Sequence, residues 1–144
     1  SNSSAASDVY KRQMKESETQ FGKYGEDLAT KLLEEHGFSV ERMSTRYAYD
    51  LYVNGSVKVD VKTARPSKAN KSFCYSFNLE KRFPTCDVYF LIAKSEEKES
   101  IYIVPASINQ TQIGLGTGTT VYSKYQDRYD IIADMSKAFA SAKS

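Results

Sequence analysis

Two carboxylates and a lysine near the Asn54-Gly55 dipeptide have the types and spacing from which a hydrolytic metal site can be built. Asn-Gly between two apolar runs predicts a two-residue hairpin turn. Side chains alternate along a strand, so Asp60 and Lys62 share one face, about 7 Å apart. The hairpin returns the first strand beside the second. We therefore expect the carboxylate of Asp50 to approach the end of the second strand that carries Asp60 and Lys62.

This set suits phosphodiester hydrolysis assisted by a hard divalent cation. Mg²⁺ prefers oxygen ligands, keeps several waters and usually takes one or two carboxylates plus phosphate oxygens; Mn²⁺ suits the same ligands. The chain has one histidine, His36, and two cysteines, which excludes a multi-histidine site or a Cys/His zinc cluster. The alternative is that Lys58, Asp60 and Lys62 form an ordinary exposed strand face with cross-strand ion pairs.

The positive charge of the chain is concentrated in its middle. The whole sequence has a formal net charge of +2, but residues 58–82 hold seven Lys and Arg against two Asp and Glu. Such a segment is typical of contact with a phosphate backbone, and a solvated face is the alternative. The basic side chains that we expect to bind DNA phosphates are Lys58, Arg65, Lys68 and Lys71. The interleaved aromatics Phe73, Tyr75 and Phe77 are either base-stacking or core residues.

The elements that position these residues follow from apolar periodicity. Recurrence at helical spacing predicts a helix from Phe21 that Gly37 ends as a C-cap. Alternation and short apolar runs predict strands at 38–43, 50–53, 57–63, 72–79, 88–94 and 101–104, the last two as neighbours. Residues 114–118 read as a flexible loop, 121–132 as a segment that can hold a strand end, and 133–143 as a helix. The expected fold class is α/β (α+β), with one central mixed β-sheet of four to six strands flanked by helices.

Length and composition set the remaining limits. A chain of 144 residues with 40% hydrophobic residues predicts one globular domain, which we place at 21–144 after a tail or linker at 1–20. The longest apolar run, Val88 to Ala93, is far too short to cross a membrane, and no signal peptide is visible. Cys74 and Cys86 are expected to be reduced. We therefore expect a cytoplasmic protein with no membrane partner.

The ordered set Gly25-Glu26, Asp50 and Asp60-Val61-Lys62 resembles the PD-(D/E)XK nuclease superfamily, whose motif is an acid, a gap and an acid-x-Lys on the following strand. The stretches 59–65 and 101–105 look like the bacterial branch related to group I intron homing endonucleases. The resemblance covers roughly Phe21 to Ile108, and Tyr49 stands where the motif's name has a proline.

The resemblance implies a restriction-endonuclease-like fold and a role for each matching residue. Asp50 and Asp60 would be the metal-binding acids, Lys62 the catalytic lysine, and the backbone carbonyl of Val61 a further metal ligand. Glu26 would be an additional metal or water ligand, or else a surface glutamate beside the apolar stripe of its helix.

The expected function is a Mg²⁺-dependent (or Mn²⁺-dependent) endonuclease that hydrolyses DNA. Because one small domain with one site commonly needs a second copy to cut both strands, we expect a homodimer or higher oligomer, or a fused or associated DNA-recognition domain. The alternatives are a catalytically inactive nucleic-acid-binding module of the same fold and a protein-interaction domain.

Overall fold

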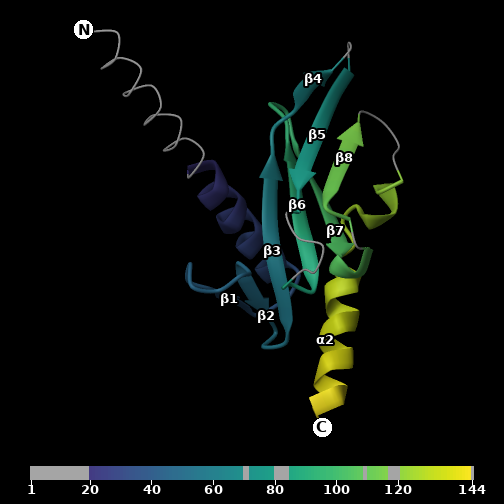
Figure 1. The fold of residues 1–144 in the computed structure, drawn as a ribbon. Helices are drawn as coiled ribbons and strands as arrows, with labels where there is room; N and C mark the ends of the chain where they lie inside the picture. Colours follow the sequence, from purple (N-terminus) through teal and green to yellow (C-terminus); the bar gives the residue numbers. More distant parts are fainter. Residues whose placement is uncertain (1–19, 70–71, 80–84, 109, 117–120, 144) are drawn as a thin grey trace, which may run out of the picture.

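A central five-stranded sheet forms the middle of the fold (Figure 1). The structure, a computed structural model, describes residues 20–69, 72–79, 85–108, 110–116 and 121–143. The strand order is β1-β2-β3-β6-β7, and β3 and β6 are parallel whereas the other pairs are antiparallel. The strands are β1 (Val40–Arg42), β2 (Leu51–Val53), β3 (Val57–Ala64), β6 (Val88–Lys94) and β7 (Glu99–Pro105). The prediction of a central mixed sheet is confirmed.

A second, antiparallel sheet of three strands lies beside the first (Figure 1). Its order is β4-β5-β8, with bounds β4 (Ser67–Ala69), β5 (Ser72–Asn78) and β8 (Gln112–Gly116). The sequence patterns predicted one sheet, and β4 and β8 were not among the predicted strands. The described residues thus form more strands than the four to six expected.

The first helix, residues 20–35 of the described part, ends as predicted at Gly37. Gly37 has a φ of +87°, and its N–H donates to Glu34 O at 3.0 Å while the N–H of Phe38 donates to Leu33 O at 3.0 Å. Two such bonds around a left-handed residue form a Schellman C-cap, which satisfies carbonyls that the helix leaves unpaired. The chain then turns directly into β1.

The predicted hairpin between β2 and β3 is confirmed. Asn54 and Gly55 have φ values of 54° and 65°, as a type I′ turn requires, and Ser56 N–H donates to Val53 O at 3.1 Å. The first paired residues are Val53 and Val57, so three residues lie between the strands and Ser56 is one more than the predicted two-residue turn. In this register Leu51 lies opposite Val59.

The two faces of the central sheet are buried against different layers. On one face, alternate strand residues such as Val59, Phe90 and Ile103 pack with Ala29 and Leu33 of the first helix, and with Tyr129 and Ile132 of α2 (Tyr129–Lys143). The residues between them on the strands face the second sheet, where they form a second cluster whose members include Leu91, Val104, Phe77, Ile113 and Leu115. Both helices therefore flank one face of the central sheet, and the smaller sheet covers the other.

Two predictions for the C-terminal part were wrong. Residues 114–116, expected in a loop, belong to β8, because buried Ile113 and Leu115 alternate with glycines that add no side chain; residues 117–118 lie outside the described residues. The segment 121–132 holds no strand beyond one isolated bridge between Tyr102 and Gln126. It contains the short 3-10 helix η2 (Ser123–Tyr125) and the start of α2; an earlier 3-10 helix, η1 (Ala106–Ile108), follows β7.

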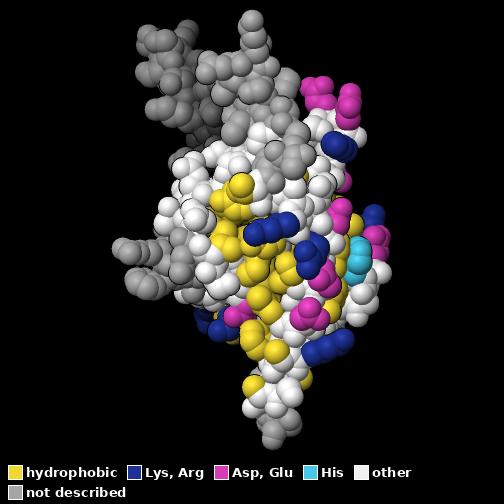
Figure 2. Space-filling view, turned by 90° about the vertical axis from the view of Figure 1, so that its right-hand side faces the viewer, with side chains coloured by type: hydrophobic (Ala, Val, Ile, Leu, Met, Phe, Trp, Pro, Cys, Tyr) yellow, Lys and Arg dark blue, Asp and Glu magenta, His cyan; other side chains and the backbone are white. Residues whose placement is uncertain are grey.

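Other side chains behave as their types suggest. Phe77 is a core residue, Tyr75 is partly buried in the same cluster, and Cys86 is a buried free thiol. Figure 2, which views the molecule from the side on which α2 lies, shows hydrophobic side chains over the middle of that face with charged side chains among them. Within the described residues, no helix is both long and apolar enough to cross a bilayer.

Candidate active site

Asp50 is held against β3 by both its backbone and its side chain. Its N–H donates to Val59 O at 3.0 Å, and its carboxylate oxygen Oδ2 accepts the N–H of Val61 at 2.8 Å. The carboxylate thus takes the place that a further residue of β2 would have in the ladder. The prediction that Asp50 approaches the second strand of the hairpin is confirmed.

This contact is available because β2 is much shorter than β3. Three residues of β2 pair with residues 57–59 of β3, and from Asp60 onward β3 is paired only with β6. The N–H of Lys58 points away from β2, toward Asp87 Oδ2 at 2.9 Å. Because the backbone N–H and C=O groups of successive strand residues point to opposite sides, those of Val59 and Val61 point toward the β2 side. The N–H and C=O of one strand residue point the same way. The carbonyl of Val61 therefore faces the side on which Asp50 lies.

Asp60 and Lys62 lie on the face of the sheet opposite to the helices. Lys62 Nζ is 3.4 Å from Asp60 Oδ2, and the side chains are only 25% and 18% exposed. Their neighbours on β3, Val59 and Val61, pack toward the first helix. The pair therefore lies on the side of the central sheet that faces the second sheet, and its low exposure leaves a charge less solvated than on an open strand face.

Glu26 reaches the same sheet edge from the first helix. The helix lies so close to β3 at Gly25 that a Cβ there would be 2.0 Å from Thr63 Oγ1. Only glycine permits this approach, which brings the next residue, Glu26, to Asp50. Arg42 of β1 lies on the outer side, with Nη2 3.3 Å from Glu26 Oε2 and Nη1 paired with Asp27.

Burial, together with the crowding of the carboxylates, shifts two pKa values upward. Burial and then hydrogen bonding with Asp50 raise the pKa of Asp60 from 3.8 to about 7, against the lowering effect of Lys62. Burial and the charge of Asp50 raise the pKa of Glu26, against the lowering effect of Arg42. Asp50 interacts with both. The negative charge at this edge exceeds what the neighbouring cations neutralise, which is the electrostatic condition that a bound cation relieves.

The donor set fits a cation that needs few protein ligands. No group of three or more His, Cys, Asp and Glu side chains in the described part is arranged to hold a metal ion. The geometry explains this, because Glu26 and Asp60 approach Asp50 from opposite faces of the sheet. The pair of Asp50 and Asp60, together with the Val61 carbonyl, matches the small oxygen set that Mg²⁺ takes while keeping several waters.

The predicted DNA-binding residues are spread more widely. Lys58 is exposed on the same face as Asp60, and its Nζ lies 5.8 Å from the ring centroid of Tyr49. Arg65 is exposed, with its guanidinium carbon 3.9 Å from the ring centroid of Phe21. Lys68 belongs to β4, with its side chain outside the described part, and Lys71 lies outside the described residues.

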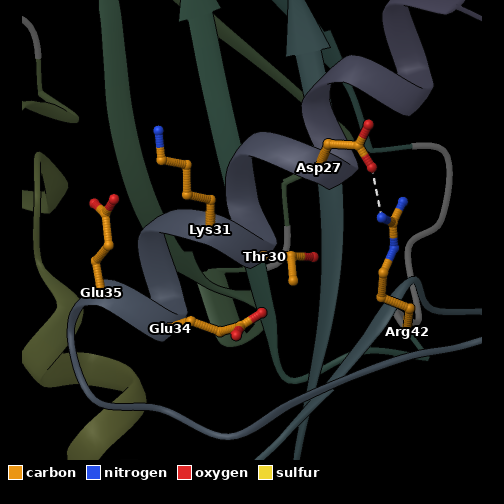
Figure 3. Close-up of a pocket in the computed structure, with 6 residues that line it drawn as sticks. All are labelled: Asp27, Thr30, Lys31, Glu34, Glu35 and Arg42. Atoms are coloured by element: carbon orange, nitrogen blue, oxygen red, sulfur yellow. Dashed lines mark hydrogen bonds and ion pairs between the residues drawn. The ribbon is translucent and has the colours of Figure 1, made fainter.

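The hollow drawn in Figure 3 is a separate feature. It lies between the outer face of the first helix and β1, and its lining includes three carboxylates, one lysine amine and one guanidinium (Figure 3). The residues are Asp27, Thr30, Lys31, Glu34, Glu35 and Arg42. The Asp27–Arg42 ion pair closes one end of it, and the catalytic candidates Asp50, Asp60 and Lys62 are not among its lining residues.

Sequence reasoning missed Arg42. It stands in a weakly alternating segment, and nothing in its local pattern indicates that it pairs with two acids of the preceding helix. The Gly25-Glu26 dipeptide on the first helix indicated Glu26 as a site residue, but it did not indicate that Arg42 pairs with it.

Comparison with solved structures identifies a neighbour of the same architecture. The bacterial homing endonuclease I-Ssp6803I superposes with a TM-score of 0.64 at 19% sequence identity, over 83% of this chain and 95% of the other. The two share a nuclease-like fold. No protein-family model matches the chain, and no curated protein matches its sequence. Membership in the PD-(D/E)XK superfamily and the roles of the individual site residues therefore stay predictions.

Proposed function

We propose that this protein is a Mg²⁺-dependent endonuclease that cleaves DNA, with a PD-(D/E)XK site. The observation that carries the proposal is the position of the Asp50 carboxylate, which is fixed by the Val61 N–H at 2.8 Å beside Asp60 and its ion-pair partner Lys62. The similarity in fold to a bacterial homing endonuclease supports it.

Asp50 and Asp60 would hold the Mg²⁺ (or Mn²⁺), with the carbonyl of Val61 as a backbone ligand. When bound, the cation supplies charge for the phosphate and lowers the pKa of a coordinated water. The Val61 N–H binds one oxygen of Asp50, and this hydrogen bond orients the carboxylate before a cation binds. Glu26, on the far side of Asp50, would be an additional metal or water ligand.

Lys62 is the cationic group of the site. Its amine lies 3.4 Å from Asp60 and lowers the pKa of that carboxyl, which favours the ionised form needed for a ligand. Because it shares a face with Asp60, the same amine can orient the attacking water or stabilise the charge that develops on the phosphate.

The DNA backbone would run along the basic side chains next to this pair. Lys58 precedes Asp60 by two residues on the same face, and Arg65 follows β3 at its end. Such contacts supply salt-dependent affinity and register but read no sequence. To cut both strands, the chain would act as a homodimer or higher oligomer, or with a DNA-recognition domain.

The test is cleavage of supercoiled plasmid and of branched DNA, in Mg²⁺ and in EDTA, by the wild-type chain and by Asp60→Ala. Asp134→Asn, which removes an exposed acid of α2, is the matched control. Cleavage that needs Mg²⁺, is lost in Asp60→Ala and persists in Asp134→Asn is the expected result.

Two outcomes overturn the proposal. Cleavage that survives in Asp60→Ala or in EDTA would remove the metal-binding role of that residue. Salt-sensitive DNA binding with no cleavage by the wild-type chain would instead establish a non-catalytic binding module of the same fold.

A further inference from the structure

An aromatic cluster formed by Tyr47, Tyr49 and Tyr52 lies on the face of the central sheet that carries Asp60, on the turn before Asp50 and on β2. The rings of Tyr47 and Tyr49 are 5.8 Å apart in an edge arrangement, and those of Tyr49 and Tyr52 are 6.0 Å apart. Tyr49 is adjacent in sequence to Asp50. It packs against the second hydrophobic cluster, so it lies on the same side of the central sheet as Asp60.

The outermost ring of this cluster faces solvent. Tyr47 is 53% exposed, whereas Tyr49 and Tyr52 are half-buried. A large aromatic side chain left open at the end of a supported row of rings offers a flat surface at the point where substrate would approach Asp50.

The segment that carries Tyr47 is fixed at both ends. Met43 N–H donates to Asp50 O at 2.9 Å, and Tyr47 N–H donates to Ser44 O at 3.1 Å. The hydroxyl of Thr85 donates to the carbonyl of Ala48 at 3.3 Å. These bonds hold residues 44–49 as a compact turn, so the position of Tyr47 relative to Asp50 is set by the fold.

Cationic side chains accompany the rings. The amine of Lys58 lies 5.8 Å from the ring centroid of Tyr49, and Arg46 is exposed on the same turn. Glu41, which lies opposite Tyr52 in the β1–β2 ladder, is an acidic neighbour of the rings. Burial is the largest cause that raises the pKa of Tyr49, followed by Tyr52 and Tyr47 and then by the charges of Glu41 and Asp87. An exposed aromatic ring with adjacent cations is the combination with which proteins bind single-stranded nucleic acid, the ring stacking on a base and the cations contacting phosphates.

We infer that residues 44–49 form a subsite for an unpaired nucleobase next to the scissile phosphate, with Tyr47 as its stacking residue. The inference rests on the proposed function and sharpens it. The preferred substrate class is DNA that offers an unstacked nucleotide at the cleavage point, such as a bulge, flap or branch, rather than continuous duplex.

Binding without cleavage tests the subsite apart from the catalytic proposal. Fluorescence anisotropy in EDTA would compare a labelled duplex with the same duplex that carries a central bulge of unpaired thymidines. The proteins are the full wild-type chain, Tyr47→Ala, Tyr47→Phe and Val121→Ala, the last of which removes an exposed apolar side chain elsewhere.

We expect wild type to bind the bulged duplex more tightly, and Tyr47→Ala to weaken that binding by roughly 5–20-fold, the effect of removing one stacking ring. Tyr47→Phe and Val121→Ala should bind like wild type. Glu41→Gln should strengthen binding of both DNAs.

Equal losses on bulged and continuous duplex in Tyr47→Ala, no loss at all, or no DNA binding by the wild-type chain would overturn the subsite. Failure of the catalytic proposal has a different signature, because it shows as absent Mg²⁺-dependent cleavage whatever the anisotropy result.

Discussion

The two halves of β3 have the same alternating sequence but different surroundings. Residues 57–59, which we call the paired half, are bonded to β2 on one side and to β6 or Asp87 on the other. Residues 60–64, which we call the open half, have no β2 residue opposite them. Instead, the N–H of Val61 donates to the side-chain carboxylate of Asp50. Where a strand partner ends, the free backbone N–H of the strand can hold a carboxylate in place. The length of β2 therefore determines where the candidate site lies.

The comparison predicts that equivalent lysines in the two halves differ in function. Lys62→Met should reduce the rate of Mg²⁺-dependent cleavage by about 100–1,000-fold, the effect of losing a group that stabilises transition-state charge. Lys58→Met should reduce it less than about tenfold and mainly lower the salt dependence of DNA binding. Single-turnover cleavage of plasmid, with anisotropy at several salt concentrations, measures both. Equal losses of cleavage rate in Lys62→Met and Lys58→Met would contradict the predicted difference between the two halves of β3.

The open half also depends on the close approach of the first helix. Gly25→Ala should destabilise the protein by about 2–3 kcal/mol, because the added methyl group overlaps Thr63 Oγ1. Thr63→Ala in the same chain should restore part of that loss, since it removes the nearest atom. Urea unfolding of the two single variants and the double variant measures the coupling, and strictly additive effects would mean that the helix does not rest on Thr63.

Core packing should be stronger in the paired half. Val59 is fully buried, whereas Val61 is only partly buried at the margin of the same cluster. We expect Val59→Ala to lower the free energy of unfolding by about 2 kcal/mol and Val61→Ala by about 1 kcal/mol. Urea unfolding compares them directly. A larger loss for Val61→Ala would contradict the described burial.

The smallest predicted effect is on the pH dependence of stability, and here the substitution stabilises the protein, whereas the core substitutions destabilise it. The pKa of Asp60 is raised to about 7 in the folded, metal-free chain, so folding favours its protonated form and this contribution to stability is lost as pH rises from about 4 through 7. Asp60→Asn keeps a neutral side chain throughout. In EDTA at pH 8 it should be more stable than wild type by about 1–2 kcal/mol, with no difference near pH 3. Thermal unfolding across this range tests it, and a pH-independent difference would refute the cause.

Much of the fold was predictable because local signals were strong. The Asn54-Gly55 turn, the Gly37 cap and the apolar run of β6 each determine a short segment by steric or burial requirements alone. The second sheet was not predictable in the same way. In β8 the two apolar residues Ile113 and Leu115 alternate with Gly114 and Gly116, so the alternation has only two apolar members. The strand that β8 pairs with, β5, is distant in sequence.

The candidate site was predictable to a similar degree. Hairpin geometry alone brings Asp50 to the second strand, and strand alternation places Asp60 beside Lys62. The contact of Arg42 with Glu26, and the row of rings from Tyr47 to Tyr52, depend on how the first helix, β1 and the turn before β2 pack in space. Sequence spacing does not encode those contacts.

The most direct measurement of the central claim is cation binding at the open half of β3. Titration of the metal-free chain with Mn²⁺ at pH 8, followed by the electron paramagnetic resonance signal of the free ion, reports binding without relying on activity. We predict that the wild-type chain and Asp134→Asn bind the ion and that Asp50→Asn and Asp60→Asn bind it at least tenfold more weakly. Binding that is unchanged in both site variants, or absent from the wild-type chain, would contradict the account.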